Sequence, residues 1–266
     1  MSRLSASQYL SAIESESARF REVLADANPT APVPSCPAWS ALDLANHLAG
    51  VQAQWAWVVA NRPKNPEERP ETDAAPTTYD AALTAVDEAS AGLVAALRDA
   101  DPADPAWTWS KEQTVGFILR RQAHEALIHR LDAELTALGH FGDLDPALAS
   151  DGVAEVLDVM FGGLPEWGEF SPLPHYIRVE LTDTGQNVWV QLGRFSGTDP
   201  SDHTHYDEDD IRVVADPGIE PDAVISSPAG IMNARLWRRG DGDSIHLAGD
   251  LEIVDHFRRV IHQPIS

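Results

Sequence analysis

Apolar side chains recur at helical spacing in the first half of the chain. From Ser5 to Ala25 they lie three or four positions apart among Ser, Glu and Arg, which predicts an amphipathic helix. A proline-rich stretch ends this pattern, and a second helix is predicted from Ser40 to about Val59. Its start carries a capping signal, because the Ser40 hydroxyl can accept a backbone N–H and Asp43 places negative charge in the first turn.

The same periodicity predicts two more helices, over Thr78–Ala100 and over Glu112–Leu138. The last of these contains no proline and stops at Gly139, a residue type that favours helix C-termini. Four long helical segments joined by loops are typical of a helical bundle. We therefore expect an all-α four-helix bundle over residues 1–140.

The pattern changes after a predicted linker at His140–Asp151. Runs of β-type residues at Tyr176–Leu181 and Val188–Leu192 flank a turn-like Thr-Asp-Thr-Gly-Gln-Asn sequence, which predicts a hairpin. The acidic segment Thr198–Asp210 is expected to be a solvated loop. Further strands are predicted at Ile211–Ala215, Ala223–Ile225 and Ser244–Leu247, and further helices at Val153–Phe161, Gly230–Trp237 and Leu251–Ile261. Residues 150–266 are thus predicted to form a small α+β domain.

Charge and composition narrow the range of partners. The 266 residues carry a formal net charge of −23, which repels nucleic-acid phosphates, and no basic patch offsets it. No apolar run approaches the roughly 20 residues of a membrane span, and the N-terminus lacks the apolar core of a signal peptide. We expect a cytoplasmic protein with neither a nucleic-acid nor a membrane partner. Cys36 is the only cysteine, which excludes an intramolecular disulfide and a cysteine-rich metal site.

Three histidines and one glutamate are candidates for a metal site. Glu125 and His129 lie four residues apart in a predicted helix, so their side chains share one face and can converge on one ion. Pairs at this spacing are more often solvated surface interactions. His124 lies nearer the middle of the apolar stripe. His47 faces the apolar side of its helix, where a core histidine with one hydrogen bond is the simpler interpretation.

Other chemistry-bearing residues favour structural interpretations. His203 and His205 lie in the acidic segment, where nothing fixes a metal geometry. Cys36 precedes a proline ahead of a helix and is expected to be structural. Arg130 and Asp132 either orient a metal-binding histidine or form surface ion pairs. Packing in the core and at its rim is expected for Trp39, Trp55 and Trp57.

Two segments resemble the mycothiol-dependent maleylpyruvate isomerase family. One is Val33–Leu48, with the sequence VPSCPAWSALDLANHL, and the other is His124–Glu134, with the sequence HEALIHRLDAE. The resemblance implies a DinB-like four-helix bundle as the first domain. It also implies a divalent metal, usually zinc, held by His47, Glu125 and His129 with one coordination position left open, as in catalytic zinc sites.

The resemblance continues in the second half of the chain. Leu236–Arg239 and Leu247–Asp250 are similar to two elements of the family's C-terminal domain, which itself resembles sterol-carrier proteins. In the family an arginine of the first element is implicated in activity, and this arginine falls on Arg239, the predicted catalytic residue. Arg238 stands where the family usually has glycine, so both arginines are candidates to face the site.

The family resemblance implies an enzyme that uses a low-molecular-weight thiol. Zinc deprotonates a coordinated thiol, so mycothiol would act as a thiolate on a small electrophilic substrate. The resemblance does not choose between isomerisation and S-transfer. The same ligand set also suits iron, manganese or nickel. No sequence pattern indicates an oligomeric state.

Two interpretations without catalysis stay open. Domains of these two kinds also serve as binding modules, so the chain could be a non-catalytic metal- or apolar-ligand-binding module. A fourth protein ligand closing the metal site would favour that function. An interaction adaptor that uses its acidic face is the other interpretation, and its partner binding would not depend on a metal.

Overall fold

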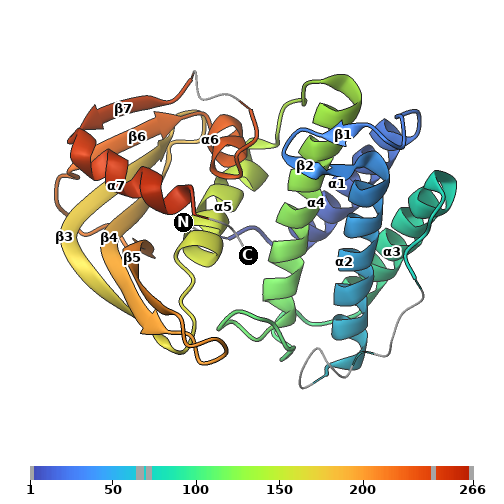
Figure 1. Cartoon of the computed structure of the whole chain (residues 1–266), viewed down its shortest axis with the longest axis horizontal. Coiled ribbons are helices and arrows are strands. Elements are labelled where there is room, and N and C mark those ends of the chain that lie inside the picture. The colour runs from blue at the N-terminus through green and yellow to red at the C-terminus, as the bar shows by residue number, and fades with distance from the viewer. Residues whose placement is uncertain (1–2, 64–68, 70–73, 241–243, 264–266) are drawn as a thin grey trace. The chain divides into compact units, whose positions relative to one another are not determined.

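The computed structural model describes residues 3–63, 69, 74–240 and 244–263. The chain divides into two compact units, Leu4–Asp143 and Leu144–Ser266, the second of which also includes Met1–Arg3. The first unit is helical apart from one short strand pair, and the second combines helices with a larger sheet (Figure 1). The predicted fold class, an all-α domain followed by an α+β domain, is confirmed.

Four long helices build the first unit. The helix α1 packs against α3 and α4, and α2 packs against the same two helices (Figure 1). Their bounds are α1 (Ala6–Leu24), α2 (Ala41–Asn61), α3 (Tyr79–Arg98) and α4 (Val115–Leu138). All four predicted helices are present, although α4 begins at Val115 rather than at the predicted Glu112. The Thr114 hydroxyl accepts the backbone N–H of Phe117 at 3.1 Å and so sets this later start.

The start of α2 is fixed by the predicted cap. The Ser40 hydroxyl accepts the Asp43 backbone N–H at 3.3 Å, and the Asp43 carboxylate accepts the Ser40 backbone N–H at 2.8 Å. This reciprocal pair satisfies two backbone donors that a helix start otherwise leaves unpaired. At its other end α4 stops at Gly139, whose φ of 76° lies in the left-handed region that glycine tolerates.

A two-stranded sheet, which the sequence pattern did not predict, precedes α2. It pairs β1 (Pro32–Val33) with β2 (Cys36–Ser40) in antiparallel fashion. Prolines in this stretch had indicated only a break between helices. The strand pair places Ser35 in its turn and Trp39 next to the start of α2, and both residues reach the site described below.

Most of α4 is buried, including several of its charged side chains. Arg130 is one of these, and its guanidinium donates to Glu16 at 2.7 Å and to Glu134 at 2.8 Å. Buried charges of this kind persist only when they are paired. Arg130 therefore belongs to an internal ion-pair network, and of the two interpretations left open for it, the surface ion pair is wrong.

The second unit contains a five-stranded sheet with the order β5-β4-β3-β6-β7. Neighbouring strands are antiparallel except for β3 and β6, which are parallel. The bounds are β3 (Gly168–Leu181), β4 (Gln186–Thr198), β5 (His205–Val214), β6 (Ala223–Ser227) and β7 (His246–Gly249). The predicted hairpin is present as β3 and β4, with Gly185 at a φ of 68° in the turn.

Helices pack against the strands of this sheet. They are α5 (Pro146–Glu155), which continues as a π-helical turn over Val156–Phe161, α6 (Ala229–Leu236) and α7 (Leu251–Ile261). None of the described helices combines the length and the hydropathy that crossing a membrane requires.

Two sequence expectations fail in this unit. The predicted linker His140–Asp151 contains the start of α5, which Asp145 caps by accepting the Leu148 backbone N–H at 2.8 Å. The predicted acidic loop is in part the strand β5. Its carboxylates are accommodated there because Arg194 on β4 donates to two of them, Asp207 at 2.7 Å and Asp209 at 3.1 Å.

Candidate metal centre

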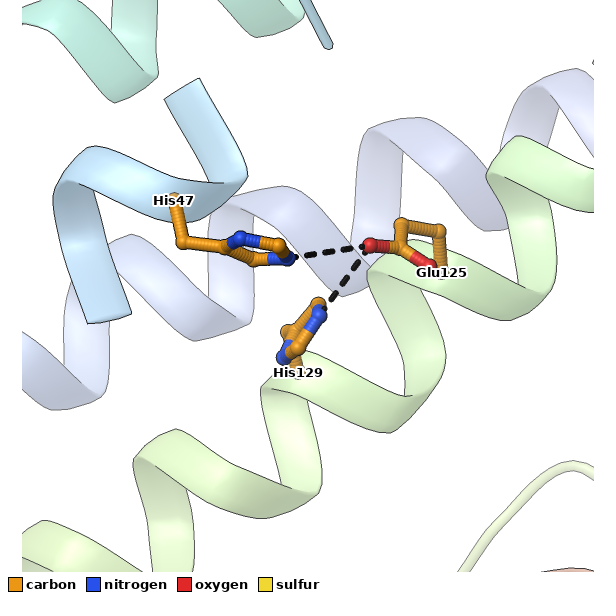
Figure 2. Close-up of side chains that lie close together, drawn as sticks. All are labelled: His47, Glu125 and His129. Carbon is orange, nitrogen blue, oxygen red and sulfur yellow. Dashed lines mark hydrogen bonds and ion pairs between the residues drawn. The ribbon is translucent and has the colours of Figure 1, made fainter. Parts of the chain in front are cut away.

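Side chains of α2 and α4 converge at one point in the first unit (Figure 2). His47, Glu125 and His129 each offer one ligand atom, and these atoms all lie within 4.8 Å of one another. The Oε1 atom of Glu125 is 3.4 Å from His47 Nε2 and 3.1 Å from His129 Nε2. In the part of the chain that the structure describes, no other three His, Cys, Asp or Glu residues form such a group.

This geometry decides two alternatives that the sequence left open. His47 is not an isolated core histidine, because its ring nitrogen faces Glu125 and its side chain is 32% exposed. Glu125 and His129 are not a solvated surface pair either, since their side chains are only 18% and 9% exposed. The site is thus a partly buried cluster of two imidazoles and one carboxylate.

Glu125 and His129 each contact a further side chain of α4 through the atom that faces away from the cluster. Arg121 donates through Nη2 to Glu125 Oε2 at 3.0 Å. The Oδ2 atom of Asp132 lies 3.0 Å from His129 Nδ1, and its Oδ1 accepts a hydrogen bond from the Ser35 hydroxyl. Asp132, with no exposed surface, is the residue that orients His129, as one of the two sequence interpretations had it.

The protonation states of the two α4 donors are coupled. Burial by itself would raise the pKa of Glu125, but the charge of His129, hydrogen bonds from both histidines and the charge of Arg121 hold it well below its usual range. Burial would lower the pKa of His129, whereas Glu125 and Asp132 raise it to about 9. An imidazole nitrogen binds a metal only when it carries no proton, so a metal ion here has to replace the proton on Nε2 of His129.

An aromatic ring lies against the two histidines. The centroid of the Trp39 ring is 4.6 Å from that of His47 and 6.4 Å from that of His129. Trp39 also packs on the hydrophobic core of the bundle, so the packing role predicted for it is present together with contact to the site. Sequence reasoning missed this contact, because the strand pair that brings Trp39 here was itself not predicted.

Two polar partners of the site were also missed. A signal existed for Arg121, which precedes Glu125 by four residues and so shares its helix face. No local signal existed for Ser35, which lies 97 positions before Asp132. Such a contact depends on how β1 and β2 fold against α4.

Several other candidates lie away from the three donors. His124 is fully buried and its ring meets the edge of Tyr9 at 6.3 Å between centroids. Trp55 stacks on Trp107 at 6.0 Å, in agreement with the predicted packing role. In the acidic segment, the His205 ring contacts the Thr198 hydroxyl at 3.2 Å. Cys36 is partly buried against the core of the bundle.

The two candidate arginines of the second unit differ in exposure. Arg238 is exposed, has a left-handed φ of 62° and donates to the Ile261 carbonyl at 3.2 Å. A left-handed φ favours glycine, which gives a physical reason for glycine to be usual at this position in the family. Arg239 is partly buried and its backbone N–H donates to the Ala234 carbonyl at 2.7 Å. A catalytic role for Arg239 stays a prediction.

Comparison with known proteins gives a match for the N-terminal domain and a fold for the chain. Residues 10–134 match the family model described as the mycothiol maleylpyruvate isomerase N-terminal domain, a range that contains His47, Glu125 and His129. No curated protein sequence matches the chain. The crystal structure of the mycothiol-dependent maleylpyruvate isomerase and that of its histidine-to-alanine mutant are each similar, with a TM-score of 0.60 and 14% identity over 92% of this chain and 93% of theirs.

A third structure, described as the UbiJ-SCP2 ubiquinone synthesis protein, matches 55% of this chain and 95% of its own at 12% identity, with a TM-score of 0.21. The two isomerase structures show that the fold extends over both units, since they cover nearly the whole chain. The chain therefore carries, over residues 10–134, a domain that matches the mycothiol maleylpyruvate isomerase N-terminal domain.

Proposed function

We propose that the protein is a metal-dependent enzyme that uses mycothiol to isomerise a small electrophilic substrate, or to transfer the thiol to it. The observation that carries this proposal is the convergence of His47, Glu125 and His129 inside the domain that matches the family. The family supports a thiol-using isomerase. The divalent metal, its three ligands and the choice of substrate are the finer parts of the proposal.

The three side chains fit a divalent metal ion. Two imidazole nitrogens and one carboxylate oxygen are donors that zinc and several other divalent metals accept. His129 has its second ring nitrogen at a buried carboxylate, as metal-binding histidines usually do. Three protein donors leave a position for an exchangeable ligand, which favours a catalytic site over a closed structural one.

A bound divalent metal would supply one chemical function, the lowering of the pKa of a coordinated thiol so that it reacts as a thiolate at neutral pH. The protein contributes orientation and shielding. Asp132 fixes the His129 ring, Arg121 fixes the Glu125 carboxylate, and the Trp39 ring covers His47. We further propose that Arg239 binds a carboxylate of the substrate through its planar set of donors.

The two reaction outcomes diverge after the first bond has formed. Addition of a thiolate to an activated alkene forms a C–S bond, moves the π electron pair onto the activating carbonyl group as an enolate, and leaves a C–C single bond about which the substrate can rotate. Elimination then returns that electron pair, breaks the C–S bond, restores the double bond in its new geometry and releases the thiolate, which is isomerisation. If the C–S bond is kept and the adjacent carbon takes a proton, the product is an S-transfer adduct.

Elemental analysis of protein purified without chelators or a His-tag tests the metal site. We expect about one equivalent of a divalent metal in the wild type and none in His129→Ala. His140→Ala is the matched control, because His140 is exposed and lies outside the three donors. A wild-type protein that holds no metal after reconstitution with a panel of divalent ions would refute the metal site.

Turnover of electrophiles tests the enzyme. We expect activity above the uncatalysed rate only when metal and mycothiol are both present, and loss of that activity in His129→Ala. A screen that includes maleylpyruvate and activated alkenes separates isomerisation, which leaves the thiol unconsumed, from S-transfer, which consumes it. A metal-loaded protein without any turnover would favour a binding module.

A further inference from the structure

The two oxygens of the Glu125 carboxylate have different partners. Oε1 faces the two histidine nitrogens, whereas Oε2 accepts a hydrogen bond from Arg121 Nη2 at 3.0 Å. Arg121 lies one helical turn before Glu125, and His129 lies one turn after it, so the three side chains share one face of α4. The Arg121 side chain is only 6% exposed, which shields this hydrogen bond from water.

The hydrogen bond from Arg121 to that carboxylate does not depend on pH in the physiological range. A guanidinium stays charged at every physiological pH, and its planar set of donors fixes the direction of the hydrogen bond. A carboxylate can bind a cation through one oxygen or through both. With Oε2 engaged by Arg121, Glu125 presents Oε1 alone to the point where His47 and His129 converge.

The same contact changes the charge of the site. The guanidinium offsets the negative charge of Glu125 within hydrogen-bond distance, in surroundings where water screens little. A divalent cation held by the three donors therefore retains more of its positive charge for a further ligand. Such a site favours an anion over a neutral molecule.

From these two effects we propose that Arg121 is a positioning residue that limits Glu125 to one-oxygen coordination and thereby selects a thiolate as the fourth ligand. This inference rests on the proposed function, because it assumes that a metal binds at the three donors. It assigns the selection of the ligand to a residue that does not itself touch the metal or the thiol.

Cobalt(II) and 2-mercaptoethanol are the probes of the test, because the visible bands of cobalt report its coordination number and a sulfur-to-cobalt band reports bound thiolate. We compare the wild type with Arg121→Gln, which removes the charge. Arg120→Gln is the matched control, since Arg120 is a buried neighbour of Arg121 on α4. Arg120 lies five positions before Glu125 and so does not share its helix face.

We expect Arg121→Gln to keep its cobalt but to show weaker visible bands, as coordination by both carboxylate oxygens raises the coordination number. We expect its affinity for the thiol to fall about tenfold or more, the scale of one charge-assisted hydrogen bond. Arg120→Gln should match the wild type in both measurements. Circular dichroism checks folding, and Arg121→Met replaces Arg121→Gln if the latter does not fold.

The outcomes separate this inference from the proposed function. A folded Arg121 variant with the wild-type spectrum and thiol affinity would overturn the role of Arg121 and leave the metal site standing. Equal losses in Arg120→Gln and in the Arg121 variant would overturn it too, because the effect would then be a general one of helix α4. A wild-type protein that binds no cobalt would overturn both proposals together.

Discussion

Asp132 links two parts of the first unit through its two carboxylate oxygens. One oxygen lies 3.0 Å from His129 Nδ1, and the other accepts a hydrogen bond from the Ser35 hydroxyl in the turn between β1 and β2. A carboxylate in this position keeps the imidazole in one orientation and makes its other nitrogen a better donor to a metal. We therefore expect the effect of a substitution on metal affinity to decrease from His129 to Asp132 to Ser35, because each lies one contact farther from the site.

Replacing Asp132 should therefore weaken metal binding without abolishing it. We expect Asp132→Asn to lower the affinity for zinc about 10–100-fold, since the neutral amide is a weaker partner for His129. Competition with a chromogenic chelator measures this affinity. Ser35→Ala should have a smaller effect, and a wild-type affinity in Asp132→Asn would contradict the role given to this carboxylate.

Asp210 in β5 is a second buried carboxylate, in a different environment. Burial raises its pKa to about 6, with Glu208 adding to the rise and the hydrogen bond from the Ile211 backbone N–H opposing it. Because the folded state binds this proton more tightly than the unfolded state does, the protonated group stabilises the fold. That stabilisation is complete below about pH 4 and is lost as the pH rises through about 6.

The consequence can be measured with Asp210→Asn, which stays neutral and keeps the acceptor for Ile211. At pH 8 we expect the free energy of unfolding of this variant to exceed that of the wild type by about 3 kcal/mol, and at pH 5 by about half as much. Denaturant unfolding at the two pH values gives these differences. Glu220→Gln is the control at an exposed carboxylate, and an equal gain at both pH values would contradict the titration of Asp210.

The candidate ligands were predictable from the sequence, whereas most of their supporting residues were not. Helical spacing brought Glu125 and His129 to one face, but only the resemblance to a family added His47 from another helix. Trp39 and Ser35 reach the site through the folding of a strand pair, which leaves no periodic signal. Long-range contacts of this kind are set by tertiary packing and not by local pattern.

At the level of elements, α2 depends on its capping box. The hydrogen bonds between Ser40 and Asp43 fix where the helix begins, and His47 lies about one helical turn beyond Asp43. The same contact lowers the pKa of Asp43 through hydrogen bonds from the Ser40 side chain and backbone. The cap is therefore a charge-assisted pair of hydrogen bonds at the N-terminus of α2, the helix that carries His47.

We expect Ser40→Ala to destabilise the first unit by about 1 kcal/mol, because the Asp43 backbone N–H loses its acceptor. Thermal unfolding followed by circular dichroism measures the change. Ser40→Thr keeps a hydroxyl and should recover most of the stability. Equal melting temperatures for the wild type and Ser40→Ala would show that the cap contributes little.

Elements were predictable where a single segment carries its own signal. The long helices have apolar periodicity and caps, and all four are present. The end of β5 overlaps the strand predicted at Ile211–Ala215, but its first part was missed because four consecutive acidic residues hide the alternation, and their partner Arg194 comes from another strand. The start of α5 was missed although Asp145 and Pro146 form a usual helix-start pair.

At the scale of the whole molecule, acidic groups outnumber basic ones by 42 to 19. Many arginines already pair with carboxylates, as Arg19 does with Glu22 and Glu134. Pairing leaves the excess of negative charge unchanged, and the unpaired carboxylates repel one another in the folded chain. Surface ion pairs contribute little individually, so the repulsion should dominate the response to salt.

We therefore expect the protein to become more stable when salt is added at neutral pH. Raising sodium chloride from about 10 to about 150 mM shortens the screening length from about 30 to about 8 Å. An increase in melting temperature of about 2–4 °C corresponds to roughly 1 kcal/mol for a chain of this size. Scanning calorimetry gives the shift, and the same experiment near the isoelectric point of 4.6 is the control, where the gain should vanish. A lower melting temperature in salt at neutral pH would mean that the ion pairs dominate.

The fold of the whole chain and its chemistry rest on different evidence. At 14% identity, similarity to the isomerase structures establishes the architecture. Related folds host unrelated activities, so the reaction has to be argued from the donors themselves. In this protein those donors occupy one unit, while Arg239 belongs to the other.

The three candidate ligands are unequally restrained, and this sets the order in which they would release a metal ion. Glu125 and His129 are each held by a neighbour on α4, whereas His47 rests against the Trp39 ring and has the most exposed side chain of the three. Dissociation starts where a ligand is held least. An ion leaving this site would release His47 first and the α4 pair last, so the rate of metal exchange should follow the motion of α2.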